Sequence, residues 1–289
     1  MNRKLLVFIL ILLPFLALSQ SKVLTSLSLN SQILQKVKKY SVYLPDKYDK
    51  QEGTYPILYL LHGLGGNETD WVIKGRVKQI ADSLIIKGLI KPMVIVMPDA
   101  EATYYMNQND GKYQFEDYFF NELMPYVEKN YRITGSRETR YIAGLSMGGF
   151  GALLYSLRHP ELFSICGAMS AAIRTDDEIR QMPWDVYGKR YAAMTGVKEG
   201  EERVCSFWNK NSILYLTSQL ADNPQYQVLF YLDCGDDDYL YKGNSALHVL
   251  MMDKQIPHEY RVRNGIHTWE YWRDSLPEVL KFIANPKMD

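Results

Sequence analysis

The stretch RYIAGLSMGGFGA, residues 140–152, decides the fold, because an apolar strand pattern runs there directly into a glycine-flanked serine and a helical pattern. A serine on so tight a strand-to-helix turn projects its hydroxyl clear of the sheet, and the flanking glycines let the backbone pack closely. The new helix also points its free N–H groups and the positive end of its dipole at this position. We therefore predict that Ser146 is a nucleophile on a strand-to-helix elbow.

A glycine-rich turn between a strand and a helix is also typical of a dinucleotide-binding loop. The glycines here are not spaced GxGxxG after a first strand, and no acidic residue ends the next strand. The nucleophile is therefore the favoured interpretation of this turn.

Outward from residue 140, apolar and β-branched runs typical of strands recur along the chain. They cover residues 40–44, 56–61, 93–97, 140–143, 163–168, 227–232 and 259–262. Helical spacing appears at residues 72–84, 118–127, 149–157, 245–253 and 269–284. Strands that alternate with helices predict an α/β fold, with a mostly parallel central sheet and helices on both faces. Residues 171–226 break the alternation, and we interpret them as an insertion near the site.

The first 20 residues have the order of a secretory signal peptide. Arg3 and Lys4 precede an apolar run, and small and polar residues follow that run. The run is shorter than the roughly 18 apolar residues of a membrane-spanning helix, and Pro14 interrupts it. We expect cleavage near Ser19, an exported protein without stable membrane insertion, and one catalytic domain over residues 21–289.

Composition excludes several classes of function. The 33 basic and 33 acidic residues balance, and no basic run interleaved with aromatic residues is present to follow nucleic acid. Three cysteines are too few for a disulfide framework. Two alternatives are kept: one bridge between Cys205 and Cys234, or three buried free thiols, which is the favoured interpretation. The chain has no HExxH, paired CxxC, P-loop or EF-hand motif, so we expect neither a cofactor nor a metal.

A serine hydroxyl becomes a good nucleophile when an imidazole takes its proton, and a carboxylate must hold that imidazole. Among the five histidines, His267 follows the last predicted strand on a short loop that opens the final helix, which is where the base is expected. His62 is expected to shape a glycine-rich turn. The other three histidines are interpreted as structural: His159, His248 and His258.

The acid should follow the strand at 227–232, where the chain reads DCGDDDYL over residues 233–240. Spacing does not choose among the four aspartates of this loop. A solvated acidic turn accounts for the carboxylates that do not meet the histidine, because like charges placed together repel.

An ester-cleaving site also needs two backbone N–H groups aimed at the developing oxyanion. Met147, directly after the nucleophile, supplies one, and Leu64 in the turn HGLGG at 62–66 is the candidate for the other. Aromatic side chains suit planar phenols and sugar rings. Trp71 and Trp269 are favoured as substrate contacts because they neighbour motif loops; the other aromatic candidates are Tyr104, Tyr105, Trp184 and Trp208.

Five motifs together resemble the esterase D family of α/β-hydrolases, over nearly the whole chain after residue 20. They are LHGLGG at 61–66, MPDA at 97–100, GLSMGGFGA at 144–152, CGDDDYL at 234–240 and GIHTWEYW at 265–272. The resemblance implies the α/β-hydrolase fold and supports Leu64 and Met147 as oxyanion donors. It also picks Asp238 as the acid, with Asp236 as second choice.

The resemblance implies an exported serine carboxylesterase that works through an acyl-enzyme. The family includes feruloyl and acetyl-xylan esterases, S-formylglutathione hydrolases and mycolyltransferases, so fold and triad do not name the substrate. Export favours feruloyl or acetyl esters on plant polysaccharide over a cytosolic thioester. Three alternatives are kept: acyl transfer to a sugar or lipid hydroxyl, an S-formylglutathione hydrolase-like thioesterase and, least favoured, a carbohydrate-binding pseudoenzyme.

Overall fold

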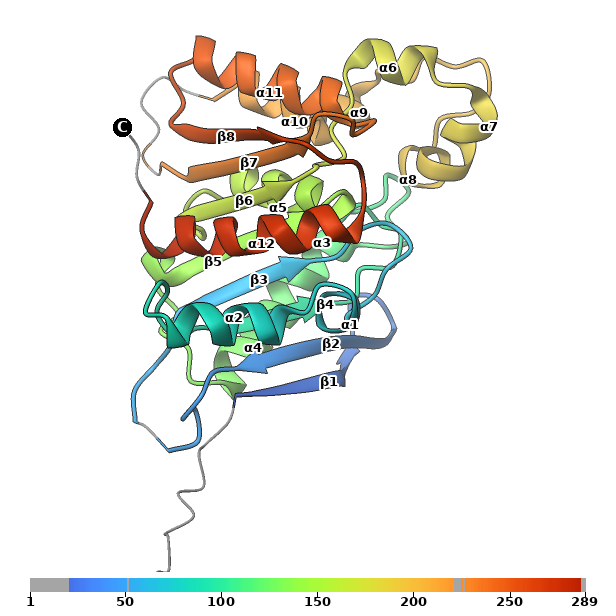
Figure 1. Cartoon of the computed structure of the whole chain (residues 1–289). Helices are drawn as coiled ribbons and strands as arrows, with labels where there is room; N and C mark the ends of the chain where they lie inside the picture. The colour runs from blue at the N-terminus through green and yellow to red at the C-terminus, as the bar shows by residue number, and fades with distance from the viewer. Residues whose placement is uncertain (1–20, 51, 221–224, 226, 287–289) are drawn as a thin grey trace, which may run out of the picture.

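The computed structural model describes residues 21–50, 52–220, 225 and 227–286. In these residues eight strands form one sheet in the order β1-β2-β4-β3-β5-β6-β7-β8 (Figure 1). Strand β2 is antiparallel to β1 and to β4, and the other neighbours are parallel, so the predicted mostly parallel sheet is confirmed. The strands are β1 (Lys22–Ser31), β2 (Lys36–Leu44), β3 (Ile57–Leu61), β4 (Val94–Pro98), β5 (Arg140–Leu145), β6 (Ile165–Met169), β7 (Leu229–Gly235) and β8 (His258–Arg263).

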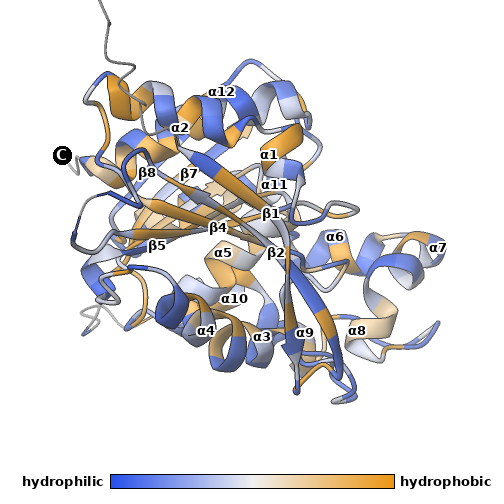
Figure 2. Cartoon of the chain, turned by 90° about the horizontal axis from the view of Figure 1, so that it is seen from below, coloured by the Kyte–Doolittle hydropathy of each residue, from blue (hydrophilic) through white to orange (hydrophobic). Residues whose placement is uncertain are grey.

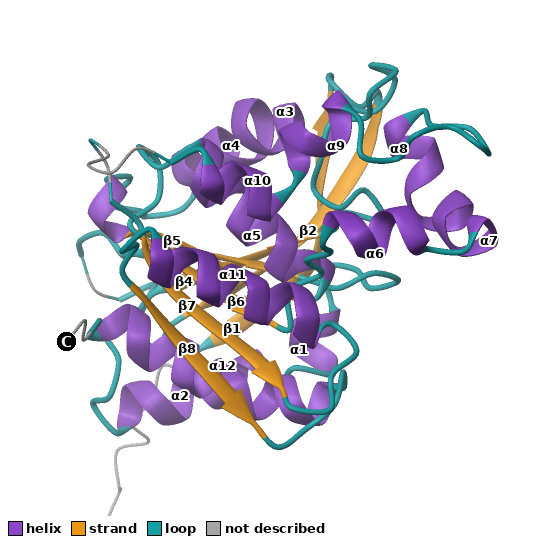
Figure 3. Cartoon of the chain, turned by 90° about the horizontal axis from the view of Figure 1, so that it is seen from above, coloured by secondary structure: helices purple, strands orange, loops and turns teal. Residues whose placement is uncertain are grey.

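Helices cover both faces of this sheet, as predicted (Figures 1 and 3). One face carries α1 (Asp70–Ile73), α2 (Val77–Ile86) and α12 (Trp269–Ala284). The opposite face carries α3 (Phe115–Tyr118), α4 (Met124–Asn130), α5 (Met147–Arg158), α10 (Ile213–Ser218) and α11 (Tyr241–Asp253). Apolar residues concentrate on the sheet, and hydrophilic residues gather on the outer sides of the helices (Figure 2).

Strand β1 has no counterpart among the predicted strands. Its ladder with β2 shifts register between Leu24 and Leu27, where Ser26 takes a left-handed φ of 54°. A bulge of this kind breaks the two-residue alternation by which a strand is recognised in sequence. The strand is therefore defined by its pairing with β2 and not by its own pattern.

Two predicted helices differ in detail from the observed ones. The helical pattern at 72–84 is divided into α1 and α2 at residues 74–76, where Arg76 takes a left-handed φ of 52°. Gly75 lies so close to Trp71 that a Cβ there would overlap its ring and backbone. The pattern at 118–127 lies inside a longer helical run, in which a π-helical turn, η1 (Phe119–Leu123), joins α3 to α4.

The described part of the segment between β6 and β7 is helical. Helices α6 (Asp176–Gln181), α7 (Trp184–Tyr187) and α8 (Ala193–Thr195) stand off the carboxyl ends of the parallel strands (Figure 1). The π-helical turn η3 (Gly188–Ala192) joins α7 to α8, and α9 (Ser206–Asn211) precedes α10.

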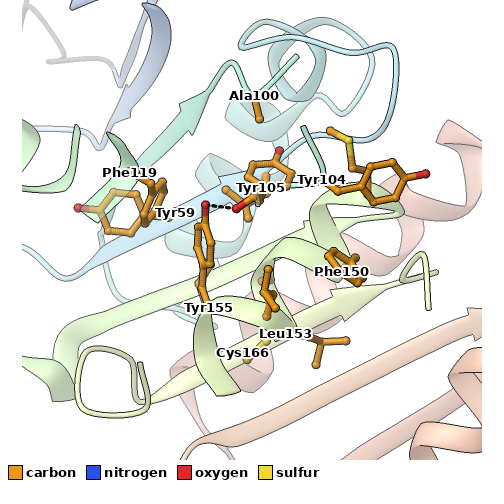
Figure 4. Packing of buried hydrophobic residues seen from close by; sticks show 14 of the residues in the cluster. Tyr59, Ala100, Tyr104, Tyr105, Phe119, Phe150, Leu153, Tyr155 and Cys166 are labelled. Carbon is orange, nitrogen blue, oxygen red and sulfur yellow. Dashed lines mark hydrogen bonds between the residues drawn. The ribbon is translucent and has the colours of Figure 1, made fainter. Parts of the chain in front are cut away.

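A cluster of buried aromatic rings anchors the loop after β4 against α5 (Figure 4). The Tyr155 hydroxyl donates to the Tyr105 carbonyl at 2.7 Å, and the Tyr105 hydroxyl donates to the His62 carbonyl at 3.0 Å. Gly151 on α5 faces the Tyr105 ring so closely that a Cβ would overlap it. These contacts fix the position of α5, which follows the predicted nucleophile, relative to the glycine turn at 62–66.

Cys166, Cys205 and Cys234 are all free thiols. The described helices include none with the length and apolar character to cross a membrane. Within the same residues, no group of three or more His, Cys, Asp or Glu side chains is arranged to hold a metal ion. The predicted signal peptide, residues 1–20, lies outside the described residues.

Candidate active site

Ser146 lies on a strained turn between β5 and α5. Its φ is 53°, a left-handed conformation that costs a non-glycine residue free energy and is typical of a nucleophile elbow. The Ser146 N–H donates to the Met169 carbonyl at 2.9 Å, which holds the turn against β6. A Cβ on Gly144 would overlap the Gly148 backbone, and one on Gly148 would overlap the Leu61 carbonyl. The two glycines therefore allow the close approach that the turn requires.

His267 connects Ser146 to Asp238. Its Nε2 lies 2.8 Å from the Ser146 hydroxyl oxygen, and its Nδ1 lies 2.8 Å from Asp238 Oδ2. Nδ1–H donating to the carboxylate leaves Nε2 free to accept the serine proton. The structure thus brings the three side chains named from the sequence into one hydrogen-bonded chain at the carboxyl ends of β5, β7 and β8.

The structure places Asp238, and not Asp236, against the histidine. Asp238 is 1% exposed, and its Oδ1 accepts the Leu240 N–H at 2.9 Å. Burial raises the pKa of this carboxyl, but hydrogen bonds from His267 and the Leu240 N–H outweigh burial and hold the pKa below its usual value. Asp238 is therefore ionised at neutral pH and can stabilise a cationic His267.

The other aspartates of the acidic loop have different surroundings. Asp236 and Asp237 are exposed, and Asp236 accepts the Gly265 N–H at 2.9 Å, which ties the acid loop to the histidine loop. Asp233 is fully buried beside Arg263, and burial raises its pKa to about 7. None of these three carboxylates is hydrogen-bonded to His267 in the described structure.

Ser170 and Trp272 support the triad residues, and the sequence reasoning missed both. The Trp272 indole N–H donates to the Ser170 hydroxyl at 3.2 Å, and the Trp272 ring meets the His267 ring edge-on at 4.8 Å. Ser170 is fully buried with a left-handed φ of 44°, and its hydroxyl contributes to the lowered pKa of Asp238. Nothing in the sequence around Ser170 indicates that its hydroxyl contacts Trp272 or affects Asp238.

His62 orients the glycine turn that contains Leu64. The Ala100 N–H donates to His62 Nε2 at 2.9 Å, so the ring proton is on Nδ1 and donates to the Gly63 carbonyl at 2.7 Å. The Gly66 N–H donates to the same carbonyl at 3.1 Å. Because the Gly63–Leu64 peptide bond is trans, its N–H points away from that carbonyl. The turn therefore fixes the direction of the Leu64 N–H.

We expect His62 to be mostly neutral at pH 6.5, with its proton on Nδ1. Burial lowers the pKa of His62, and the hydrogen bond to the Gly63 carbonyl offsets only part of that effect. Because the unfolded chain binds this proton more readily, the free energy of unfolding falls as the pH drops below about 6.5. Nitrogen NMR of the imidazoles across pH 5 to 8 measures the tautomer and the titration. A His62 ring that is half protonated at pH 6.5 or above would contradict this account.

The structure does not favour Trp71 as a substrate contact. Trp71 is 1% exposed, and its indole N–H donates to the Leu61 carbonyl at 3.0 Å, so it supports the end of β3 from the core. Trp269 is half-buried and packs edge-on against Trp71, with ring centroids 5.3 Å apart. Of the further aromatic candidates, Tyr104 and Tyr105 are buried as well. Trp71, Tyr104 and Tyr105 are core residues. The sequence pattern could not distinguish an aromatic ring that packs in the core from one that contacts substrate.

Three clefts lie beside the loops that carry the site residues in the described structure. One of about 340 Å³ is lined by Ile266, Thr268 and Glu270, among others, and the other two adjoin the glycine turn and the acid loop. The cleft at the glycine turn, which we call the Leu64 cleft, has a volume of about 280 Å³ and is lined by Leu64, Thr103, Gln108, Tyr113 and Met194, among others. The cleft at the acid loop, the Tyr239 cleft, has a volume of about 350 Å³ and is lined by Arg174, Glu178, Gln181, Arg190 and Tyr239, among others. The Leu64 cleft and the Tyr239 cleft are both lined in part by residues of the helices that stand off the strand ends.

Residues 31–283 match the model of the family described as Putative esterase. The chain belongs to this esterase family. A solved ferulic acid esterase is 34% identical, with a TM-score of 0.79, and the match covers 92% of this chain and 98% of that one. The predicted α/β-hydrolase fold and the resemblance to feruloyl and acetyl esterases are confirmed by these likenesses.

Two curated relatives of this esterase are also similar. An endo-1,4-beta-xylanase/feruloyl esterase of Xylanibacter ruminicola is 37% identical over 52% of this chain but only 22% of its own length, so the chain spans about a fifth of that relative. An acetyl esterase of Caldicellulosiruptor saccharolyticus is 28% identical over 88% of this chain and 93% of its own length. The chain is therefore a carboxylic ester hydrolase.

Proposed function

We propose that Ser146, His267 and Asp238 are the catalytic triad of an exported serine carboxylesterase. The observation that carries the proposal is the pair of 2.8 Å contacts that join the three side chains. The ionised, buried Asp238 fits the role of the group that stabilises the histidine cation. The intact chain of contacts argues against a carbohydrate-binding pseudoenzyme.

The geometry supports an acyl-enzyme mechanism. Ser146 Oγ attacks the ester carbonyl carbon while His267 Nε2 takes the hydroxyl proton. The carbonyl oxygen becomes an oxyanion, which the Leu64 and Met147 N–H groups stabilise. His267 then gives its proton to the departing alcohol oxygen, which leaves the acyl group on Ser146. A water molecule, deprotonated by His267, attacks the acyl-enzyme and releases the acid and the free serine.

We further propose feruloyl or acetyl esters on plant polysaccharide as the substrates. The similar proteins described above are named as feruloyl or acetyl esterases, and one of them is also named as a xylanase. The Leu64 cleft, at about 280 Å³, is near the lower end of small-molecule pockets, about 300 Å³. That volume suits an acetyl group or a single aromatic acyl group better than a long lipid chain. Export by way of residues 1–20 would bring the enzyme to such substrates.

Ester release from a small panel tests this proposal. We expect the purified chain to cleave methyl ferulate or a short acyl nitrophenyl ester, and feruloylated or acetylated xylan, with much weaker activity on S-formylglutathione. Liquid chromatography of the released acids measures each rate. Ferulate release identifies a feruloyl esterase, and acetate release alone identifies an acetyl esterase. A preference for S-formylglutathione, or ester synthesis on added sugar alcohols that exceeds hydrolysis, would contradict the proposed substrate class.

A further inference from the structure

Tyr239 is a half-exposed aromatic ring held beside the proposed base. It follows Asp238 directly in the chain and is 52% exposed. The centroid of the Tyr239 ring lies 4.7 Å from the centroid of the His267 ring. The Arg174 guanidinium lies 5.5 Å from the centroid of the Tyr239 ring. An exposed tyrosine contacted by two neighbours is restricted in its rotamers, so its open surface is presented in a defined orientation.

The Tyr239 cleft combines this ring with planar polar side chains. Arg174 and Glu178 pair at 2.8 Å, and Glu178 also caps the first turn of α6 by accepting the Thr175 N–H at 3.0 Å. Gln181 and Arg190 line the same cleft. Guanidinium, carboxylate and amide groups offer fixed donors and acceptors, which match the hydroxyl groups of a sugar. Aromatic rings supply the apolar contact for the C–H face of a sugar ring.

The proposed chemistry decides which part of the substrate lies there. His267 Nε2 must reach the leaving oxygen to protonate it, so the alcohol part of the ester lies on the histidine side of Ser146. The Tyr239 ring is in contact with His267 on that side. The Leu64 cleft adjoins the oxyanion turn instead and is left for the acyl group.

We propose that the Tyr239 cleft binds the neutral sugar residue that carries the ester, with the Tyr239 ring as its stacking surface. The inference rests on the proposed esterase function. Glu178 compensates the charge of Arg174, and the neutral sugar follows from the feruloyl or acetyl esters proposed above; Arg190, which also lines the cleft, is the group that would favour an acidic sugar instead. A volume of about 350 Å³ provides space for a sugar ring and for the bond that joins this sugar to the polysaccharide.

The test compares kcat/KM for a feruloylated arabinose–xylose disaccharide with kcat/KM for methyl ferulate. We expect the wild-type ratio to exceed 1 and Tyr239→Ala to lower it about three- to tenfold, the effect of losing one aromatic contact. Tyr239→Phe keeps the ring and should keep the ratio. Tyr241→Ala is the matched control, because Tyr241 is equally exposed (49%) two residues further on and does not line the cleft. Gln181→Ala is a second cleft variant and should lower the ratio as well, because Gln181 lines the Tyr239 cleft and does not line the Leu64 cleft, whereas Arg190 lines both.

The outcomes separate this inference from the esterase proposal. Methyl ferulate cleavage that needs Ser146, together with a ratio unchanged in Tyr239→Ala and Gln181→Ala, would overturn the sugar site and leave the esterase standing. A preference for uronic acid esters that Arg190→Gln abolishes would replace the neutral sugar with an anionic one. A wild-type chain that cleaves no ester would overturn both.

Discussion

Replacing Ser146 with alanine lowers the kcat of ester hydrolysis about 10⁶-fold, the size of loss seen when a triad nucleophile is removed. The substitution deletes the attacking oxygen and its contact with His267 but leaves the turn, the glycine contacts and the Ser146 N–H bond to Met169 in place. We therefore expect Tm to shift by less than about 3 °C. Stopped-flow or discontinuous assays with methyl ferulate, together with calorimetric unfolding, measure both quantities.

His267→Gln provides the companion variant. Because base and nucleophile act as one unit, the single loss should be comparable, and the double variant should be no slower than either single one. Additive losses in the double variant would show that the two residues act independently. Near wild-type activity in Ser146→Ala would remove the serine from the mechanism altogether.

Asp238→Asn should lower kcat about 10⁴-fold, as expected when the carboxylate that orients a catalytic histidine is replaced. The asparagine amide can donate to His267 Nδ1, which places the imidazole proton on Nε2, facing the serine hydroxyl. That tautomer cannot accept the serine proton. The geometry of the loop is retained, because the side-chain oxygen still accepts the Leu240 N–H. Steady-state kinetics and the NMR tautomer of His267 measure the two consequences.

Asp236→Asn and Asp237→Asn are matched controls on the same loop. Both carboxylates are exposed, and an asparagine at 236 still offers an oxygen to the Gly265 N–H. Each control should keep activity within a fewfold of wild type. If Asp236→Asn loses activity while Asp238→Asn keeps it, the second-choice acid is the correct one.

Local patterns were sufficient where a function or an element is specified by adjacent residues. The turn at 144–148 needs its glycines and its serine in direct succession, so it can be recognised without any distant partner. The last helix, α12, begins and ends at the residues that the apolar spacing predicted, Trp269 and Ala284. The parallel strands β3 to β7 were found for the same reason, since they are mostly buried and read as apolar runs, whereas the edge strand β8 is only partly buried.

Long-range contacts decided the features that local patterns left open. The choice of Asp238 among four aspartates depends on a histidine 29 residues away, and the contact of Ser170 with Trp272 spans 102 residues. Trp71 has the same local sequence whether it binds substrate or supports β3, and only its burial shows that it is in the core.

The sequence by itself determined the α/β class, the nucleophile turn and the candidate base, because each follows from the spacing of neighbouring residues. The tertiary structure alone decided where β1 pairs despite its bulge, and that Tyr239 presents a half-exposed ring beside the base. It also brought Asp238, which spacing left open and the family resemblance favoured, into contact with His267. The physical reason is that burial, hydrogen-bond partners and cleft walls are properties of segments brought together by folding, and no single segment encodes them.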